Sequence, residues 1–370
     1  MHTVKKSEDF NMKQLSVKTS THDYEVYVGK SLRFQLNELL PKKYSRILIV
    51  TDDIIAPLYL EDIKKVLSDE KVAITDIVIP NGEFSKNIEQ FYHLQTVALE
   101  NHLDRHSLII ALGGGVIGDL AGFVAATFMR GIDYIQMPTT ILAHDSSVGG
   151  KVAINHELGK NLIGAFYPPR AVIYDVDTLQ TLPSHEVRSG YAEIVKEAFI
   201  AQNDLVDDLL SKRLVDIKED ELIDHLYRGI AIKGHIVEQD EKESYMRMFL
   251  NFGHTLAHAI EAELGYGDIT HGEAVAIGML FALQVSEDYM RVDLQSNRYK
   301  QWLLTNEYPL SLYGIHRDDI IEKMKLDKKS TNEQIQMVLL KTFEQPTVVH
   351  LSDERMATYL DTFIKELSET

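Results

Sequence analysis

The sequence contains no cysteine among its 370 residues. This absence excludes disulfides, thiolate nucleophiles, Cys-x-x-Cys redox pairs and every cysteine-ligated metal or iron–sulfur site. Any bound metal ion must therefore be held by His, Asp or Glu side chains.

Positive charge and long apolar runs are also scarce. The 38 Lys and Arg residues against 56 Asp and Glu give a formal net charge of −18, which disfavours nucleic acid and anionic membranes as partners. No apolar run reaches about 18 residues, no signal-peptide pattern is present, and residues 1–11 are mostly charged and polar. We therefore expect a cytoplasmic protein in which residues 1–11 form a disordered extension.

The pattern of apolar residues divides the remaining chain into two domains. Short β-branched runs alternate with helical patterns over residues 12–180, which predicts an α/β domain with a Rossmann-like parallel sheet. The strands are expected at 14–19, 24–28, 46–52, 73–80, 107–113 and 133–138. Residues 181–370 predict a mostly α-helical domain, with helical periodicity over 185–212, 219–240, 246–264 and 272–290 and one strand at 336–340.

A glycine turn follows the strand expected at 107–113. Gly113, Gly115 and Gly118 satisfy the pattern G-x-G-x-x-G between a strand and a helix, where a helix N-terminus can bind pyrophosphate. A tight strand-to-helix turn without a ligand can have the same glycines. The ribose contact is expected from Asp52 at the end of an earlier strand, although a strand-end turn explains Asp52 equally well.

Two lysines each follow a glycine in the next stretch, residues 138–164. Lys151 in DSSVGGK and Lys160 in GKN lie beside flexible backbone, which suits the binding of phosphate oxygens. Solvated surface lysines are the alternative interpretation.

The helical half contains a polar stripe and a candidate metal site. Arg247, Asn251, His254 and His258 have the spacing i, i+4, i+7 and i+11, which would align them on one face of a single helix. Thr255 stands where a zincin has its glutamate, which argues against a metalloprotease. His254 and His271 need a carboxylate for a three-ligand site, and Glu193 is the best candidate; an exposed i, i+3 ion pair with Lys196 is the alternative.

Taken together, these segments resemble the 3-dehydroquinate synthase family. The resemblance rests on GGGVIGDLAGFVAATFMRGI, MPTT, DSSVGGK, GKNLIGAFYPP, SGYAEIVKEAFI, LNFGHTLAHAIE, HGEAVAIG and DKK, which occur in family order. Two departures are the shortened spelling LAHDSS, which brings in His144 before Asp145, and Val152 where Thr is usual.

The resemblance implies a homodimeric, NAD- and metal-dependent carbon–oxygen lyase with zinc or cobalt bound by Glu193, His254 and His271. The implied NAD contacts are Asp52, Glu83, Lys86, Gly114, Gly115, Val116, Gly118, Asp119, Thr139, Thr140, Lys151, Lys160, Thr178, Leu179, Gln180 and Thr181. The implied substrate and catalytic residues are Asp145, Lys151, Asn161, Lys196, Lys233, Arg247, Asn251, His258, one of Lys328 and Lys329, and Arg130, which would reach the neighbouring subunit's site.

The family converts 3-deoxy-D-arabino-heptulosonate 7-phosphate to 3-dehydroquinate and phosphate in the shikimate pathway, toward chorismate and the aromatic amino acids. The implied reaction combines transient oxidation at C5 by NAD, phosphate elimination, reduction and an intramolecular aldol closure. Two alternatives stay open at this point. One is another sugar phosphate cyclase or a metal- and NAD-dependent polyol dehydrogenase on the same scaffold, and the other is a catalytically silent NAD-binding protein.

Overall fold

The computed structural model describes residues 12–68, 72–243, 245–264, 269–312, 314–326 and 334–368. The chain forms two compact units. The first comprises the chain up to Leu182 together with Glu219–Lys242, and the second comprises Pro183–Lys218 and the chain from Glu243 onward. Among the described residues, no helix combines the length and apolar character needed to cross a membrane.

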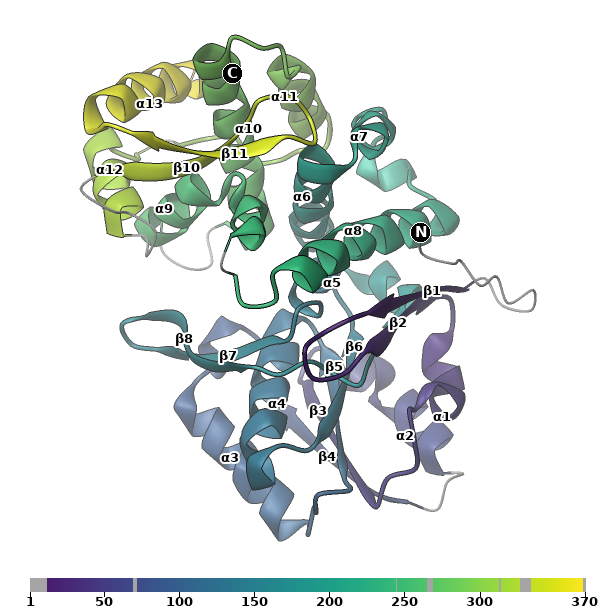
Figure 1. The fold of residues 1–370 in the computed structure, drawn as a ribbon. Coiled ribbons are helices and arrows are strands. Elements are labelled where there is room, and N and C mark those ends of the chain that lie inside the picture. Colours follow the sequence, from purple (N-terminus) through teal and green to yellow (C-terminus); the bar gives the residue numbers. More distant parts are fainter. Residues whose placement is uncertain are drawn as a thin grey trace. The chain divides into compact units, whose positions relative to one another are not determined.

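The first unit is built on a seven-stranded sheet with the strand order β1-β2-β9-β6-β5-β3-β4 (Figure 1). The strands are β1 (Met12–Val17), β2 (Tyr24–Gly29), β3 (Arg46–Asp52), β4 (Ala73–Ile79), β5 (Leu108–Gly113), β6 (Asp133–Pro138) and β9 (Ala171–Asp175). β1 and β2 pair antiparallel, whereas the other neighbours in the sheet run parallel. The expected α/β class and all six strands expected in this half are confirmed, and β9 is additional.

Helices cover both faces of this sheet. Along β3, Ile47 and Ile49 point to one apolar core and Leu48 and Val50 to the other, because side chains alternate along a strand. The first core is closed by α1 (Leu36–Leu39) and α2 (Glu61–Ser68), and the second by α3 (Ile88–Glu100) and α4 (Gly115–Thr127). Burial on both faces explains why these strands are continuously apolar.

Several smaller elements complete the first unit. They are the helical turns η1 (Leu32–Gln35), η2 (Ala56–Leu60), η3 (Glu83–Ser85), η4 (Phe128–Arg130) and η5 (Val176–Thr181), the helices α5 (Ala143–Ser146) and α8 (Glu219–Gln239), and the antiparallel hairpin of β7 (Lys151–His156) and β8 (Gly159–Phe166). The hairpin was not among the expected strands. Its tip extends away from the sheet (Figure 1).

Helix α8 belongs to the first unit although it comes late in the chain. It packs on β1, and a Cβ on Gly234 would lie 3.5 Å from the Cγ2 of Val17. The backbone N–H of Lys18 donates to the Oε1 of Glu238 over 3.2 Å. The expected division assigned all of residues 181–370 to the helical domain, so the compact units differ from it in the place of α8.

The second unit is mainly helical, as expected. Its elements are α6 (Ser184–Ala201), α7 (Asn203–Leu210), η6 (Leu214–Asp216), η7 (Met246–Asn251), α9 (His254–Leu264), α10 (His271–Met290), α11 (Ser296–Thr305), α12 (Arg317–Leu326), β10 (Ile335–Leu340), β11 (Pro346–Leu351) and α13 (Asp353–Ser368). Helix α10 is buried on nearly all sides over its first three turns, so it forms the centre of the unit.

The single helix expected over 246–264 is wrong. The segment is a 3-10 turn, η7, followed by a break and then by α9, which begins at His254. Gly253 has a φ of +82° at the break, a left-handed conformation that an α-helix cannot contain. The predicted alignment of Arg247 and Asn251 with the two histidines on one helix face is therefore also wrong.

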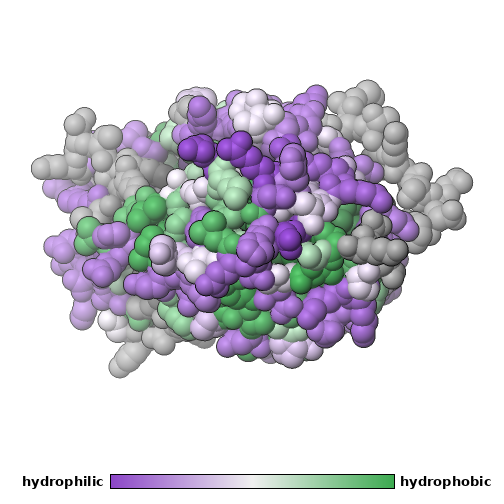
Figure 2. Space-filling model, turned by 90° about the horizontal axis from the view of Figure 1, so that it is seen from below, coloured by the Kyte–Doolittle hydropathy of each residue, from purple (hydrophilic) through white to green (hydrophobic). Residues whose placement is uncertain are grey.

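Large apolar side chains are exposed on parts of the surface. On the first unit they include Phe84, Ile88 and Tyr92 on η3 and α3, and Leu162 and Phe166 on β8. Figure 2 shows one face of the molecule, on which hydrophobic patches lie among hydrophilic residues. Contiguous apolar patches of this kind mark contact sites more often than single exposed residues do.

Candidate active site

Helix packing in the second unit brings Glu193, His254 and His271 together. Glu193 lies inside α6, whereas His254 and His271 are the first residues of α9 and α10. A Cβ on Gly272 would lie 1.9 Å from the carbonyl oxygen of Ser189, so α10 touches the α6 backbone one turn before Glu193. A Cβ on Gly253 would likewise lie 2.6 Å from the Cγ of Met279 in α10. Two glycines thus allow the close approach that the site requires.

The N-terminus of α10 is held by a capping box and an ion pair. The N–H of Glu273 donates to the Oγ1 of Thr270 over 3.3 Å, and the N–H of Thr270 donates to the Oε2 of Glu273 over 3.2 Å. The Nε of Arg188 in α6 donates to the Oε1 of Glu273 over 2.7 Å. These contacts fix the backbone that carries His271.

Both imidazoles direct one nitrogen toward the same carboxylate oxygen. The Nε2 atoms of His254 and His271 each lie 3.5 Å from the Oε1 of Glu193. The Nδ1 of His254 lies 3.2 Å from the carbonyl oxygen of Phe252, and the Nδ1 of His271 lies 3.0 Å from the Oε2 of Glu261. When both rings are neutral with Nδ1 as the donor, both Nε2 lone pairs are available to a metal ion, which is the usual arrangement around a histidine ligand.

Burial and charge set the protonation of the three groups. Burial works to raise the pKa of Glu193, but the adjacent Lys196 and the two imidazoles outweigh it and hold that pKa well below its usual range. Burial lowers the pKa of His254 to about 4. Burial also disfavours the His271 cation, but hydrogen bonds to Glu193 and Glu261 raise the pKa of His271 to about 10.

The donor set suits a transition metal ion. One ligand atom from each of Glu193, His254 and His271 lies within 4.8 Å of the others. One carboxylate and two imidazoles form a three-ligand site for Zn²⁺ or Co²⁺ that keeps a coordination position open. Glu193 and Lys196 are each 1% exposed, so the alternative of an exposed ion pair is wrong.

The other polar residues expected near this site occupy different positions. Arg247 and Asn251 lie on η7, where Arg247 is buried and the Nδ2 of Asn251 donates to the carbonyl oxygen of Met248 over 2.9 Å. His258 is exposed, and its ring centroid lies 5.5 Å from that of His254. Lys328 and Lys329 lie outside the described residues.

In the first unit, the glycine turn meets the loop that follows β6. A Cβ on Gly114 would lie 3.1 Å from the Cγ2 of Thr140, and one on Gly115 would lie 3.1 Å from the Oγ of Ser146. Gly114 is the N-cap of α4 and makes no side-chain capping bond. Because the N-cap residue is a glycine, it has no side chain that could accept from the first N–H groups of α4. An anion site at a helix N-terminus requires such uncapped N–H groups.

Three buried hydroxyls in or after the β6 loop have no hydrogen-bond partner among the residues that the structure describes. They are the Oγ1 of Thr139, the Oγ of Ser146 and the Oγ of Ser147. Buried polar atoms are nearly always paired, so a polar ligand would satisfy them. The glycine turn and these hydroxyls fit the phosphate and hydroxyl groups of a dinucleotide. The resemblance identified Thr139, whereas Ser146 and Ser147 carried no signal beyond their position after Asp145.

The edge of the sheet also gathers the charged residues expected at the cofactor. The Nζ of Lys86 lies 2.5 Å from the Oδ2 of Asp119 in the first turns of α4. The Oε1 of Glu83 accepts from the Nδ2 of Asn155 over 2.7 Å. The Oδ1 of Asp52 accepts the N–H groups of Ile54 and Ile55, which confirms its strand-end turn role. β3 and β5 are neighbours where the strand order reverses, and ligands bind at such points in α/β sheets.

The remaining expected residues of the first unit are spread over several helices and the β7–β8 hairpin. The Oδ2 of Asp145 on α5 lies 2.9 Å from the Nζ of Lys233 on α8. Lys151, Lys160 and Asn161 lie on the β7–β8 hairpin, and Val116 and Gly118 lie in the first turn of α4. Thr178, Leu179, Gln180 and Thr181 form the end of η5, where the hydroxyl of Tyr59 donates to the carbonyl oxygen of Thr178 over 3.1 Å. His144 is fully buried, and its Nδ1 lies 2.7 Å from the carbonyl oxygen of Ile141.

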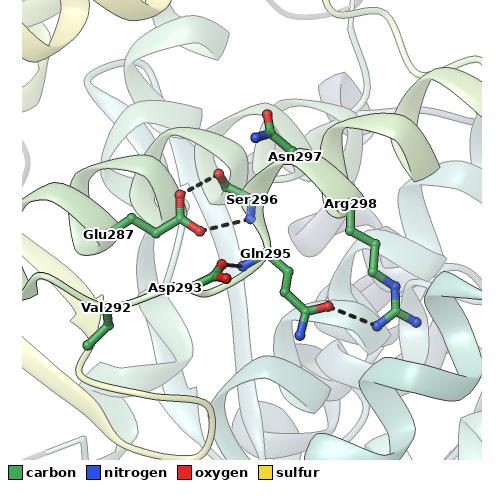
Figure 3. Close-up of a pocket in the computed structure, with 7 residues that line it drawn as sticks. All are labelled: Glu287, Val292, Asp293, Gln295, Ser296, Asn297 and Arg298. Carbon is green, nitrogen blue, oxygen red and sulfur yellow. Dashed lines mark hydrogen bonds between the residues drawn. The ribbon is translucent and has the colours of Figure 1, made fainter.

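A surface hollow at the start of α11 includes a carboxylate that caps this helix (Figure 3). It is lined by Glu287, Val292, Asp293, Gln295, Ser296, Asn297 and Arg298. The Oε1 of Glu287 accepts the N–H groups of Leu294 and Ser296, each over 2.9 Å, so a carboxylate of the protein already fills this helix N-terminus.

Similar solved structures define the fold class of this protein. One is a 2-deoxy-scyllo-inosose synthase complexed with carbaglucose-6-phosphate, NAD⁺ and Co²⁺ (TM-score 0.84, 24% identity, covering 95% of this chain and 99% of that one). Another is the 2-epi-5-epi-valiolone synthase of Streptomyces hygroscopicus subsp. jinggangensis with NAD⁺ and Zn²⁺ bound (TM-score 0.83, 23% identity, covering 94% and 98%). The chain thus has the fold of these cyclases, with a sheet unit and a helical unit that carries a candidate Glu/His/His centre.

Sequence comparisons identify the family within this class. The models of the 3-dehydroquinate synthase N-terminal and C-terminal regions match residues 76–189 and 190–330. The 3-dehydroquinate synthases of Oceanobacillus iheyensis (55% identity, 97% of this chain and 100% of the relative) and Geobacillus thermodenitrificans (48%, 96% and 99%) are similar over nearly their whole length. The chain belongs to the 3-dehydroquinate synthase family.

Proposed function

We propose that this protein is an enzyme that converts 3-deoxy-D-arabino-heptulosonate 7-phosphate to 3-dehydroquinate and inorganic phosphate. The observation that carries this proposal is the buried trio Glu193, His254 and His271, intact in a chain that is 55% identical to a 3-dehydroquinate synthase. The reaction would make it a carbon–oxygen lyase of the shikimate pathway in the cytoplasm. The full-length identity does not favour another cyclase or a polyol dehydrogenase.

The trio would hold a zinc or cobalt ion. When bound, such an ion supplies Lewis-acid polarisation of substrate hydroxyl groups. Glu193 is kept ionised by Lys196, and each Nδ1 is oriented by an acceptor. His271, whose pKa is raised to about 10, would give up its proton when the ion binds.

The glycine turn and its surrounding residues would hold NAD, which supplies a hydride acceptor that is regenerated within one turnover. The unpaired hydroxyl of Thr139 and the uncapped first turn of α4 support this assignment. The further proposed contacts are Asp52, Glu83, Lys86, Asp119, Thr140, Lys151, Lys160 and residues 178–181.

Cationic side chains would bind the carboxylate and phosphate of the substrate. We assign this role to Lys151 and Lys233 in the first unit and to Lys196 and Arg247 in the second. Asp145, Asn161 and Asn251 would orient hydroxyl groups, and His258 would transfer a proton because it is exposed one turn from His254.

We also propose that the protein is a homodimer in which Arg130 reaches the partner's site. Met129 and Arg130 have φ values of 48° and 68°, an unfavourable conformation, and both side chains are exposed. A Cβ on Gly131 would lie 3.0 Å from the hydroxyl oxygen of Tyr167, and Phe166, the residue before Tyr167, is exposed. An arginine among exposed apolar residues suits an interface.

The test is phosphate release from the heptulosonate phosphate with zinc and catalytic NAD. We expect turnover by the wild type, and in Glu193→Gln a loss of turnover together with a zinc content below that of the wild type. Glu354→Gln removes an exposed carboxylate of the second unit and should leave both unchanged. Absence of release by the wild type would refute the function, and full zinc content in Glu193→Gln would refute the metal assignment.

A further inference from the structure

A second cluster of potential metal ligands lies beside the proposed metal site. One ligand atom from each of His258, Glu261 and His271 lies within 4.8 Å of the others. His271 is common to both groups, whereas His258 and Glu261 have no part in the first. The two clusters therefore meet at one imidazole ring.

The ring of His271 is placed between two carboxylates. Its Nε2 lies 3.5 Å from the Oε1 of Glu193, and its Nδ1 lies 3.0 Å from the Oε2 of Glu261. The separation of 3.0 Å is close to the distance of about 3.3 Å that two ligand atoms have when each is bonded to one tetrahedral zinc ion. Little movement is needed for an ion to bind at Nδ1 and Glu261.

The geometry of α9 supplies the third ligand. His254, His258 and Glu261 have the spacing i, i+4 and i+7 along this helix, so they lie on one face in that order. The rings of His258 and His271 are near-parallel, with an angle of 27° and centroids 6.1 Å apart. His258 is exposed and Glu261 is 8% exposed, so this cluster is open to solvent on the His258 side.

We propose that His258, Glu261 and His271 form a second, outer binding position for a divalent transition metal ion. Two imidazoles and a carboxylate favour Zn²⁺, Co²⁺ or Ni²⁺ over Mg²⁺ and Ca²⁺, which prefer oxygen ligands. Because the two positions share His271, an ion in one opposes binding in the other, and the second equivalent binds at least about tenfold more weakly. An ion in the outer position would occupy His258 and inhibit turnover; this last consequence rests on the proposed function.

The experiment measures zinc binding by isothermal titration of the chelator-treated, full-length protein. We expect two equivalents for the wild type, unaffected by millimolar Mg²⁺. His258→Asn and Glu261→Gln should each bind one equivalent. Glu193→Gln should also retain one, because the outer ligands are intact. His350→Asn, which removes an exposed histidine of β11, should bind two equivalents as the wild type does.

The pattern among the variants separates this proposal from the proposed metal site. A single equivalent that is lost in Glu193→Gln and kept in His258→Asn would overturn the outer position and leave the inner one standing. A second equivalent that persists in both His258→Asn and Glu261→Gln would also overturn it. A single equivalent lost in His258→Asn and kept in Glu193→Gln would support the outer position and refute the inner one. Circular dichroism melting of each variant checks that it is folded.

Discussion

The α-carbon of Gly272 faces the carbonyl oxygen of Ser189 so closely that a Cβ on Gly272 would lie 1.9 Å from that oxygen. The N–H of Gly272 also donates to the Oγ of Ser189 over 3.1 Å. Since Gly272 follows His271 and Ser189 precedes Glu193 by one helical turn, this contact sets the separation of two proposed metal ligands.

Gly272→Ala should therefore disturb the metal site without changing any ligand. The added methyl group forces α10 away from α6, and overpacking of this kind costs about 1–3 kcal/mol. We expect a lower melting temperature and zinc binding weakened at least tenfold, measured by calorimetry.

Gly234→Ala is the matched control in α8. Its Cβ would meet only ordinary contacts at 3.5 and 3.8 Å, and alanine favours a helix interior by about 1 kcal/mol over glycine. This variant should be as stable as the wild type or more so. Wild-type zinc affinity in Gly272→Ala would show that the contact does not position the ligands.

Zinc binding should release one proton near neutral pH. The pKa of His271 is raised to about 10 and that of His254 is lowered to about 4, so only His271 carries a proton that the ion must displace. Affinity should rise about tenfold per pH unit between pH 6 and 9, because the metal-free protein stays protonated below its raised pKa. Titration calorimetry in two buffers of different ionisation enthalpy counts the proton.

Glu261→Gln provides the comparison for this pH dependence. It replaces one of the two carboxylates that raise the pKa of His271, so that pKa should be lower than in the wild type. The zinc affinity should therefore stop rising with pH at a lower pH than in the wild type. Equal proton release by the two proteins at pH 9 would contradict the role of Glu261.

Some elements could be predicted from the sequence because their signals are local. The continuous apolar runs of β3 and β5 predict buried parallel strands, and both occur where expected. The break at Gly253 could not be predicted, since helical periodicity continues across it, whereas the left-handed φ and the close contact with Met279 belong to the tertiary structure. The place of α8 in the first unit depends on packing against β1, which chain order does not reveal.

The same distinction holds for the candidate site. The trio of Glu193, His254 and His271 could be reached from residue type and spacing, because the absence of cysteine restricts the ligands to His, Asp and Glu side chains. The roles of Glu261 and Ser146 depend on contacts between distant segments. In the sequence, nothing distinguishes this glutamate and this serine from other residues of the same types.

Replacement of Thr139 by valine should separate cofactor binding from stability. The Oγ1 of this residue is buried and unpaired, so valine of nearly the same shape removes an unsatisfied group. Without NAD, we expect thermal melting to give an unchanged or higher melting temperature. We expect isothermal titration calorimetry to show an NAD affinity lowered about fivefold or more. Lower stability together with wild-type NAD affinity would contradict this assignment.

Asp119→Asn should destabilise the first unit even without NAD. Lys86 is 4% exposed and its Nζ lies 2.5 Å from Asp119, so the variant leaves a buried ammonium group with only the more distant carboxylate of Glu83, 3.9 Å away. Loss of one partner of a buried pair costs about 3–5 kcal/mol. Urea denaturation should show this loss, and combining Asp119→Asn with Lys86→Met should recover part of it because the unpaired charge is then gone.

Glu61→Gln removes an exposed partner of Lys64, 3.2 Å away, and should change the free energy of unfolding by less than about 1 kcal/mol. If Asp119→Asn were as mild as Glu61→Gln, the Lys86–Asp119 pair would not support the turn that carries the glycines.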